Sequence, residues 1–251
     1  MITDPYFYAA AIPAVLLMGL AKGGLAGVSI VATPLLALVV PPVQAASIML
    51  PILIVQDVVG VWAFRRTVDW SILKLMLPFA TVGILLGYAL ARFTPDAALE
   101  LTLGLISAAF GAQRLWVERH AAAPAKPPPT WLAGVLGVAT GFTSMVANAG
   151  GPTWQVYILP RRLPRDLMIG VTAVFFAIVN WLKTPAFFAL GQFTSQTLLT
   201  AAVLTPLAVL STWLGVWVVR RMDGEVFYKV IYVLSIAVGV KLMWDGVTGL
   251  V

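Results

Sequence analysis

The sequence contains no cysteine, a single histidine and few charged residues. Without cysteine, the chain has no disulfide scaffold, no thiolate metal ligand and no cysteine nucleophile. The one histidine, His120, lies in a segment rich in alanine and proline, which excludes a histidine metal site. Charged residues make up 10% of the chain, against about a quarter of an average soluble domain. We therefore expect no metal and no cofactor. We also expect that most of the chain is not surrounded by water.

What the chain does contain is apolar. Hydrophobic residues make up 61% of it and the mean hydropathy is +0.96. Nine Trp and 17 Pro fit helices that are anchored at membrane interfaces and locally broken inside lipid. Residues 1–8 include Asp4 but no Lys or Arg, so we do not expect a cleavable signal peptide there. These features predict an all-α polytopic membrane protein whose partner is the lipid bilayer, with no nucleic acid bound despite a net charge of +6.

Prolines, glycines and charged clusters divide the sequence into eight apolar stretches. Two of them, 6–40 and 130–160, contain glycine-rich breaks at 20–24 and 147–152. Each break is flanked by about 15 apolar residues, roughly 22 Å of helix, which is short of an apolar core about 30 Å thick. This length favours a re-entrant hairpin but leaves two short full crossings open. The other stretches predict single crossings at 43–64, 70–92, 96–119, 164–190, 195–220 and 225–250.

The distribution of basic residues tests the topology. If both broken segments return to the side they came from, ten basic residues fall on one side and only Arg92 falls clearly on the other. Cytoplasmic loops collect Lys and Arg, so this side is predicted to be cytoplasmic and both termini to lie outside the cytoplasm. If each broken segment crossed once, the bias would disappear. The ten residues are Arg65, Arg66, Arg114, Arg119, Lys126, Arg161, Arg162, Arg165, Arg220 and Arg221.

The two halves of the sequence resemble each other. Residues 78–116 align with 206–244 at a constant shift, and the glycine pairs of the two breaks recur at nearly the same shift. Each half then contains one hairpin and three crossings, and an odd number of crossings inverts the second copy relative to the first. We predict a repeat at 1–120, a cytoplasmic Pro/Ala linker at 121–129 and a second repeat at 130–251. The matches are Pro78/Pro206, Gly87/Gly215, Arg92/Arg220, Ser107/Ser235, Gly111/Gly239 and Trp116/Trp244.

The two hairpin tips are the predicted binding site for an anion. The first turn of each returning arm has backbone N–H groups without intrahelical acceptors, and the helix dipole adds partial positive charge there. Inverted symmetry would bring the two tips together near mid-membrane. The alternative is that the glycines only permit tight helix packing. The tip glycines are Gly23, Gly24, Gly150 and Gly151.

Ionisable side chains at membrane depth are functional candidates by default. Lys22 adjoins the first tip and either pairs with the anion or is an ordinary interface lysine. Lys183 shares a helix face with Asn180, although its long stem could snorkel outward. Asp57, beside Gln56, could carry a coupling proton or Na⁺, or simply neutralise a lysine. Neutral hydrogen-bonding candidates near the tips, each of which could instead serve packing alone, are Ser29, Thr33, Asn148, Thr153 and Gln155.

At this point the motifs resemble those of a known family. The glycine-rich stretches at 19–28 and 141–152, the Pro-led helices after Pro41-Pro42 and Leu163-Pro164, and the corner Val68-Asp69-Trp70 are similar to signatures of the TauE/SafE sulfite-exporter permeases. The resemblance covers nearly the whole chain. It implies secondary transport of sulfur-containing anions such as sulfite, sulfoacetate or other organosulfonates, commonly outward across a bacterial inner membrane, by a two-fold repeated helical fold.

The sequence departs from the family pattern in two places. Lys22 stands where the family commonly has a small residue, which could adjust anion selectivity. The second corner reads Gln192-Phe193-Thr194 and lacks the Asp-Trp pair, so the two halves need not work identically.

The resulting functional prediction is an exporter, not an enzyme, with alternating access of the two repeats to a mid-membrane anion. A passive anion channel is an alternative, and saturable flux that responds to an ion gradient would favour the carrier. An intramembrane enzyme is the less favoured alternative, because no acidic pair with an adjacent Ser or Arg occurs at membrane depth. The sequence leaves open the anion, the direction, the coupling ion and the oligomeric state.

Overall fold

The computed structural model describes residues 1–22, 28–64, 68–119, 129–219 and 225–250. These residues form helices and no strand. The first half contains α1 (Pro5–Lys22), η1 (Val28–Val31), α2 (Ala32–Ala37), α3 (Pro42–Phe64), α4 (Trp70–Phe93) and α5 (Asp96–Arg119). The second half contains α6 (Thr130–Ala147), α7 (Gly151–Ile158), η2 (Leu159–Arg161), α8 (Arg165–Ala189), α9 (Ser195–Val219) and α10 (Glu225–Leu250).

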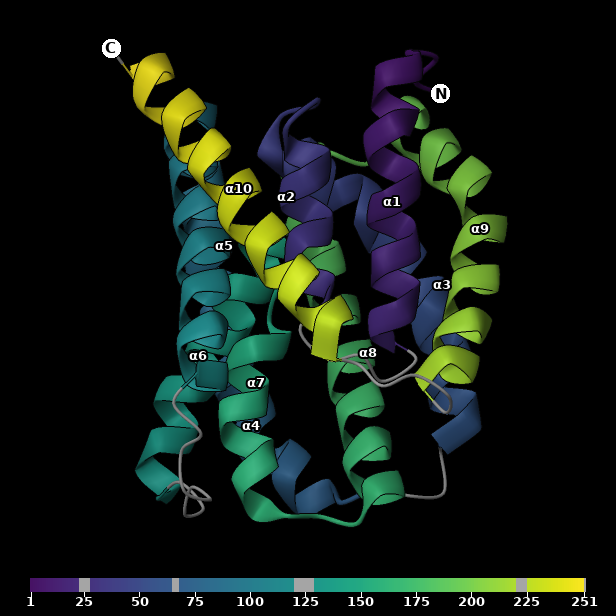
Figure 1. Ribbon diagram of the computed structural model, residues 1–251, viewed down its shortest axis with the longest axis vertical. Helices are drawn as coiled ribbons and strands as arrows, with labels where there is room; N and C mark the ends of the chain where they lie inside the picture. The colour runs from purple at the N-terminus through teal and green to yellow at the C-terminus, as the bar shows by residue number, and fades with distance from the viewer. Residues whose placement is uncertain (23–27, 65–67, 120–128, 220–224, 251) are drawn as a thin grey trace.

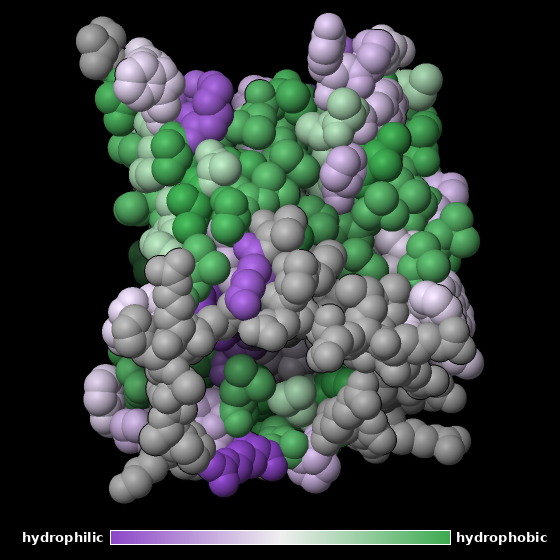
Figure 2. Space-filling model, viewed as in Figure 1, coloured by the Kyte–Doolittle hydropathy of each residue, from purple (hydrophilic) through white to green (hydrophobic). Residues whose placement is uncertain are grey.

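Within the described residues, six helices are long and apolar enough to cross a membrane: α1, α3, α4, α8, α9 and α10. The 24-residue α5 runs alongside α10 (Figure 1). Figure 2 shows a mostly apolar surface over α1, α9 and α10. Tryptophans such as Trp62, Trp70 and Trp244 are exposed, as expected for side chains that meet lipid and its interfaces. The prediction of an all-α polytopic membrane protein is confirmed.

The structure describes the break in the second predicted segment but not the break in the first. In the first, α1 ends at Lys22 and the next described residue is Val28; Gly23 and Gly24 lie outside the described residues. In the second, α7 has eight residues and η2 has three. Together they span about 16 Å of helix, which is too short to cross the apolar core. In Figure 1, α2 returns toward the beginning of α1, and α7 turns back toward the beginning of α6. The second segment is therefore a hairpin that enters and leaves by one face.

The two termini lie at the same end of the molecule (Figure 1). We call it the terminal end, and we call the other, where α5 ends and α6 begins, the linker end. Arg92 lies in the last turn of α4 at the terminal end, whereas Arg161 ends η2 at the linker end and Arg162 follows it. Five other basic residues of the topology prediction lie outside the described residues: Arg65, Arg66, Lys126, Arg220 and Arg221.

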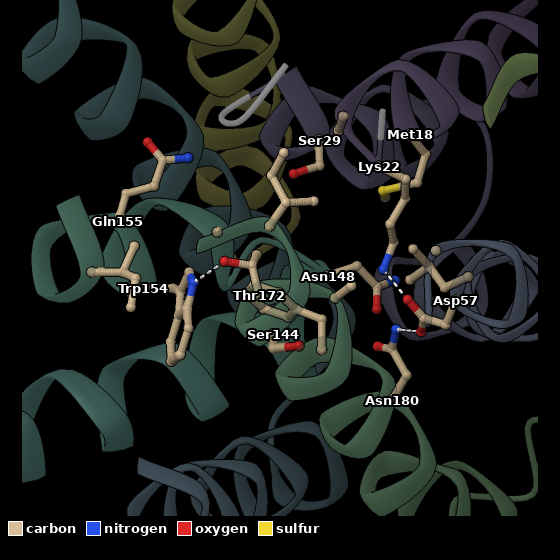
Figure 3. Close-up of a pocket in the computed structure, with 18 of the residues that line it drawn as sticks. Met18, Lys22, Ser29, Asp57, Ser144, Asn148, Trp154, Gln155, Thr172 and Asn180 are labelled. Atoms are coloured by element: carbon tan, nitrogen blue, oxygen red, sulfur yellow. Dashed lines mark hydrogen bonds and ion pairs between the residues drawn. The ribbon is translucent and has the colours of Figure 1, made fainter. Parts of the chain in front are cut away.

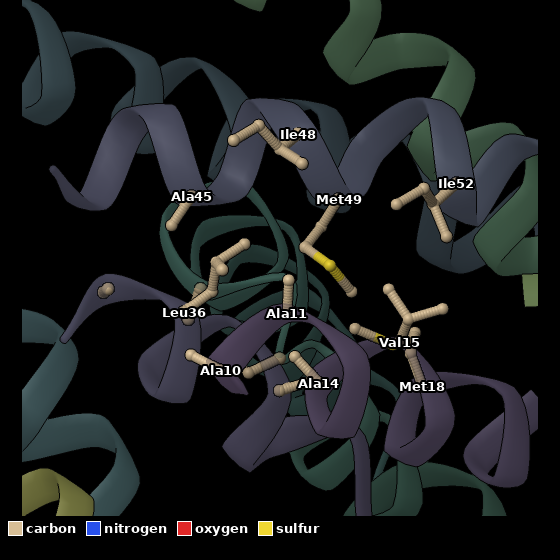
Figure 4. Packing of buried hydrophobic residues seen from close by; sticks show 14 of the residues in the cluster. Ala10, Ala11, Ala14, Val15, Met18, Leu36, Ala45, Ile48, Met49 and Ile52 are labelled. Carbon is tan, nitrogen blue, oxygen red and sulfur yellow. The ribbon is translucent and has the colours of Figure 1, made fainter. Parts of the chain in front are cut away.

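Close helix packing fixes the position of the hairpins. α1 packs against α9 and α6 packs against α4. A Cβ atom at Gly19 would overlap Ser211 of α9, and one at Gly141 would overlap the backbone of Ala80 in α4, so both contacts require glycine. Figure 4 shows Val15 of α1, Leu36 of α2 and Met49 of α3 in one buried cluster. The arms that carry the two breaks are thus held in the protein interior.

Candidate functional site

The second tip is built around Asn148, the residue that directly follows the last residue of α6. Asn148 has a left-handed backbone conformation with φ of 51°, a region in which asparagine is enriched. Its N–H donates to the carbonyl of Ser144 at 3.1 Å, and the N–H of Ala149 donates to the carbonyl of Thr143 at 3.1 Å. These bonds close α6, and α7 begins at Gly151. The tip is buried, so its polar groups need partners inside the protein.

The Asn148 side chain joins four elements. Its Nδ2 donates to the Thr33 hydroxyl of α2 at 3.3 Å and to the Ala46 carbonyl of α3 at 3.2 Å. Its Oδ1 accepts from the Lys183 ammonium of α8 at 2.7 Å, and Lys183 also donates to the Ser144 carbonyl at 3.1 Å. Lys183 is completely buried, so it does not snorkel. It lies behind the tip and orients it.

An ion pair faces this tip from the other half. The Lys22 ammonium at the end of α1 pairs with Asp57 Oδ1 of α3. The second oxygen of Asp57 accepts from Asn180 Nδ2 of α8 at 2.5 Å. The Lys22 side chain keeps 17% exposure and Asp57 only 4%. Lys22 can therefore reach the neighbouring open space, while the carboxylate is shared between the partly exposed Lys22 ammonium and the buried Asn180 amide.

These groups line a cavity of about 160 Å³. In Figure 3, Lys22, Asp57, Asn148 and Asn180 gather on one side of it. Ser29 and Gly151, which follow the two breaks, both line the cavity; a Cβ placed on Gly151 would lie 3.7 Å from the Ser29 hydroxyl. The structure thus brings the residues after the two breaks face to face. The polar lining is Lys22, Ser29, Asp57, Ser144, Asn148, Gln155, Thr172 and Asn180.

The opposite wall of the cavity is aromatic. Trp154 of α7 stacks on Phe175 of α8 with ring centroids 4.0 Å apart and planes 16° apart. Its indole Nε1 donates to the Thr172 hydroxyl at 2.9 Å, as Figure 3 shows. This stacked and hydrogen-bonded wall fixes the returning arm α7 against α8.

The remaining predicted residues lie away from the cavity. Gly150 packs against α6, because a Cβ there would lie 2.8 Å from the Thr140 carbonyl. Thr153 donates to the Gly150 carbonyl at 3.0 Å and accepts from Thr140. The Gln56 amide is fully buried and donates to the Ala208 carbonyl of α9 at 3.4 Å. These three residues support the tip or the helix packing in the structure.

Sequence reasoning missed several residues of the site. Ser144 lies one turn before Asn148, and this spacing places both on one helix face, so it was within reach of the sequence. Trp154 and Thr172 had no such signal. Arg114 was assigned to the cytoplasmic side but not to the site, and its guanidinium donates to Gln155 Oε1 in α7. Arg114 therefore supports the wall of the cavity from α5.

The charges at the site are unequal. Among the described residues that line or support the cavity, Lys22, Lys183 and Arg114 carry three formal positive charges and Asp57 carries one negative charge. The first turn of α7 adds the N–H group of Gly151 to the cavity lining, whereas the N–H of Trp154 is already bonded to the Gly150 carbonyl at 3.1 Å. The described residues contain no cluster of His, Cys, Asp and Glu suited to a metal ion. The arrangement suits a small anion.

A comparison with protein families matches residues 11–242 to the family described as Sulfite exporter TauE/SafE. The match covers both halves, both breaks and every residue of the cavity lining. No curated protein and no solved structure matches the chain.

Proposed function

Because this chain belongs to the sulfite exporter TauE/SafE family, a family of multi-pass membrane transporters for sulfite-type anions, we propose that it binds sulfite, sulfoacetate or another small organosulfonate in the cavity between its two helix breaks. The protein is a secondary transporter on this proposal, and it exports its anion. The six apolar helices among the described residues agree with a bacterial inner-membrane location.

The observation that carries this proposal is the surplus of positive charge around a buried cavity. Buried charges are normally paired, because an isolated charge loses its hydration. Asp57 neutralises Lys22, but Lys183 has only neutral partners, Ser144 and Asn148. An anion in the cavity would supply the missing negative charge. The N–H group of Gly151, which lines the cavity at the start of α7, would bind one of its oxygens.

The volume of the cavity agrees with such a ligand. One water needs about 10–15 Å³ of accessible space, so a cavity of about 160 Å³ accepts an anion of several atoms. Apolar residues such as Met18, Leu53 and Phe176 also line it. This lining would accept the organic part of a small organosulfonate.

Reciprocal contacts support an inverted repeat. The pair α1 and α9 corresponds to the pair α6 and α4 when the halves are exchanged, and both pairs pack closely. Pro78 lies inside α4 and its match Pro206 inside α9. At the contact between α5 and α10, the Ser107 hydroxyl donates to the carbonyl of its own match, Ser235, at 2.9 Å. Rocking of one half against the other would then expose the anion alternately.

The orientation proposed for the protein places the terminal end in the periplasm. The linker end carries Arg161 and Arg162 among the described residues, and basic residues mark the cytoplasmic side. Leu159 and Met168, near the linker end, line the cavity. The structure would then present the cavity toward the cytoplasm, the side from which an exporter loads.

Asp57 is the residue proposed to carry the coupling proton or Na⁺. Its carboxylate competes with a bound anion for the Lys22 ammonium, because Lys22 pairs with Asp57 Oδ1. A proton or Na⁺ on Asp57 would release Lys22 for the anion. Coupling of this kind links the two ligands through one shared partner.

Transport of sulfite into proteoliposomes tests the proposal, with Lys22→Ala as the variant. We expect saturable flux in the wild type and a KM raised about tenfold or more in Lys22→Ala, because a hydrogen bond to a charged group contributes about 1.5–3 kcal/mol. Lys74→Ala, at an exposed lysine of α4, is the matched control and should leave KM unchanged. No flux with sulfite or any organosulfonate would refute the function. An unchanged KM in Lys22→Ala would remove Lys22 from the site.

A further inference from the structure

A second cavity, of about 500 Å³, opens at the terminal end. It lies where α3 and α5 begin and where α4 and α8 end. Its polar lining is Gln44, Arg92, Asp96 and Gln192. The cavity described above as the anion site is lined instead by residues near the linker end, such as Leu159 and Met168. The two cavities therefore approach the centre of the protein from opposite ends.

A small void lies between the two cavities. Val43 and Ala91 line both the outer cavity and this void of about 10 Å³. On its inner side the void meets Ala46, whose carbonyl accepts from Asn148 at the anion site. Since one water needs about 10–15 Å³, the void is closed to an oxyanion. Met145 and Phe187 complete this constriction.

We infer that the outer cavity is the periplasmic vestibule of the anion pathway and that Met145 and Phe187 form its closed gate. The inference rests on the proposed function for the identity of the anion. The inference about the path is supported by the spatial order of the outer cavity, the constriction and Asn148. In the structure, the cavity at the anion site can hold a ligand, whereas the constriction closes the path from that cavity to the outer cavity. A transporter that works by alternating access must have one state in which only one side is open.

The gate residues are coupled to the anion site by their position. Phe187 lies one helical turn after Lys183 on α8, so the two share a helix face, and Met145 lies in the last turn of α6, three residues before Asn148. Lys183 and Asn148 are bonded to each other at 2.7 Å. A shift of α8 relative to α6 would therefore have two effects at once. It would disturb the hydrogen bond between Lys183 and Asn148, and it would separate the side chains of Met145 and Phe187.

Arg92 is the group in the vestibule that would attract the anion. Its Nη1 donates to the Tyr88 hydroxyl at 2.6 Å, and the residues that the structure describes offer it no ion pair, although Asp96 lines the same cavity. A guanidinium has five N–H donors. One of these donors is used by Tyr88, and Arg92 lines the vestibule, so its remaining donors would be available to bind oxyanion oxygens.

The absence of cysteine makes the gate testable by thiol labelling. Ala46→Cys places a thiol at the inner side of the constriction, and an impermeant reagent is added at the terminal end, with Phe93→Cys as the accessible marker of that end. Phe187→Ala should raise the labelling rate of this cysteine at least about tenfold, which corresponds to about 1.4 kcal/mol of gate opening. Phe188→Ala is the matched control, because Phe188 is the next residue and is 75% exposed, whereas Phe187 is 1% exposed.

Equal labelling rates in Phe187→Ala and Phe188→Ala would overturn the gate. The assay uses no sulfite, so it gives its answer even if sulfite proves not to be the substrate. The vestibule is tested separately in vesicles of known orientation. Arg92→Gln should raise the KM of sulfite presented at the terminal end about tenfold, and an unchanged KM there would overturn the role of Arg92.

Discussion

Replacing Gly151 with leucine should abolish sulfite transport in a protein that still folds and inserts. Gly151 opens α7 and lines the cavity, and the nearest atom to a Cβ there is the Ser29 hydroxyl at 3.7 Å, which is an ordinary contact. The backbone therefore tolerates a side chain. An isobutyl group would fill the cavity and cover the N–H groups of α7. Loss of such donors to an anion reduces rates by about 100- to 1000-fold, and flux into proteoliposomes should fall by at least that factor.

Two alanine variants separate this effect from damage to the fold. Gly151→Ala adds only the tolerated Cβ and should retain most of the transport. Gly60→Ala, at another glycine of the cavity lining, meets only the Ala173 methyl at 3.8 Å and should behave like the wild type. Size-exclusion profiles and melting temperatures in detergent check folding. If Gly151→Leu transports at the wild-type rate, the anion does not bind at this tip.

Asp57→Asn should uncouple the transporter from its driving ion. The variant keeps an acceptor for Asn180 but has no carboxylate to take up a proton or Na⁺. Coupling free energies of about 1–3 kcal/mol correspond to about 5- to 150-fold, so an imposed gradient should lose most of its stimulation of sulfite flux. Exchange of labelled for unlabelled sulfite, which needs no gradient, should continue. Proton and Na⁺ gradients applied one at a time identify the coupling ion.

The double variant Lys22→Met, Asp57→Asn is the control for charge balance, because removing Asp57 alone leaves Lys22 without its ion-pair partner. If Asp57 only neutralises Lys22, the double variant should recover the gradient response. If the wild-type flux responds to neither gradient, Asp57 carries no coupling ion and the protein is a uniporter or a channel.

The hairpin of the second half was predictable from local chemistry. Gly150, Gly151 and Pro152 stop α6 and start α7, and proline is favoured in the first turn of a helix. Asn148 provides the left-handed residue that ends α6. The hydrogen bond between Asp57 and Asn180 had no such signal in the sequence. The hairpin features depend on short-range sequence, which is visible in one sequence.

Other parts of the site depend on packing that the sequence does not specify. Gln56 and Asp57 are neighbours on α3, about 100° apart around the helix, and the helix is apolar on all sides. The sequence therefore does not decide which of the two faces the cavity. The structure turns Gln56 toward Ala208 and Asp57 toward Lys22. The contact of Arg114 with Gln155 in α7 was not predictable for a similar reason, because a basic residue near a helix end resembles a surface charge until α7 is seen beside it.

The binding site is tested most directly by a crystal structure of the protein with selenite, the heavier analogue of sulfite, whose selenium is located by its anomalous scattering. We expect a selenium peak in the cavity between Lys22, Asn148 and Gly151, and no such peak in Gly151→Leu. A peak confined to the outer cavity or to the membrane surface, with this cavity empty in protein that transports sulfite, would contradict the proposed site.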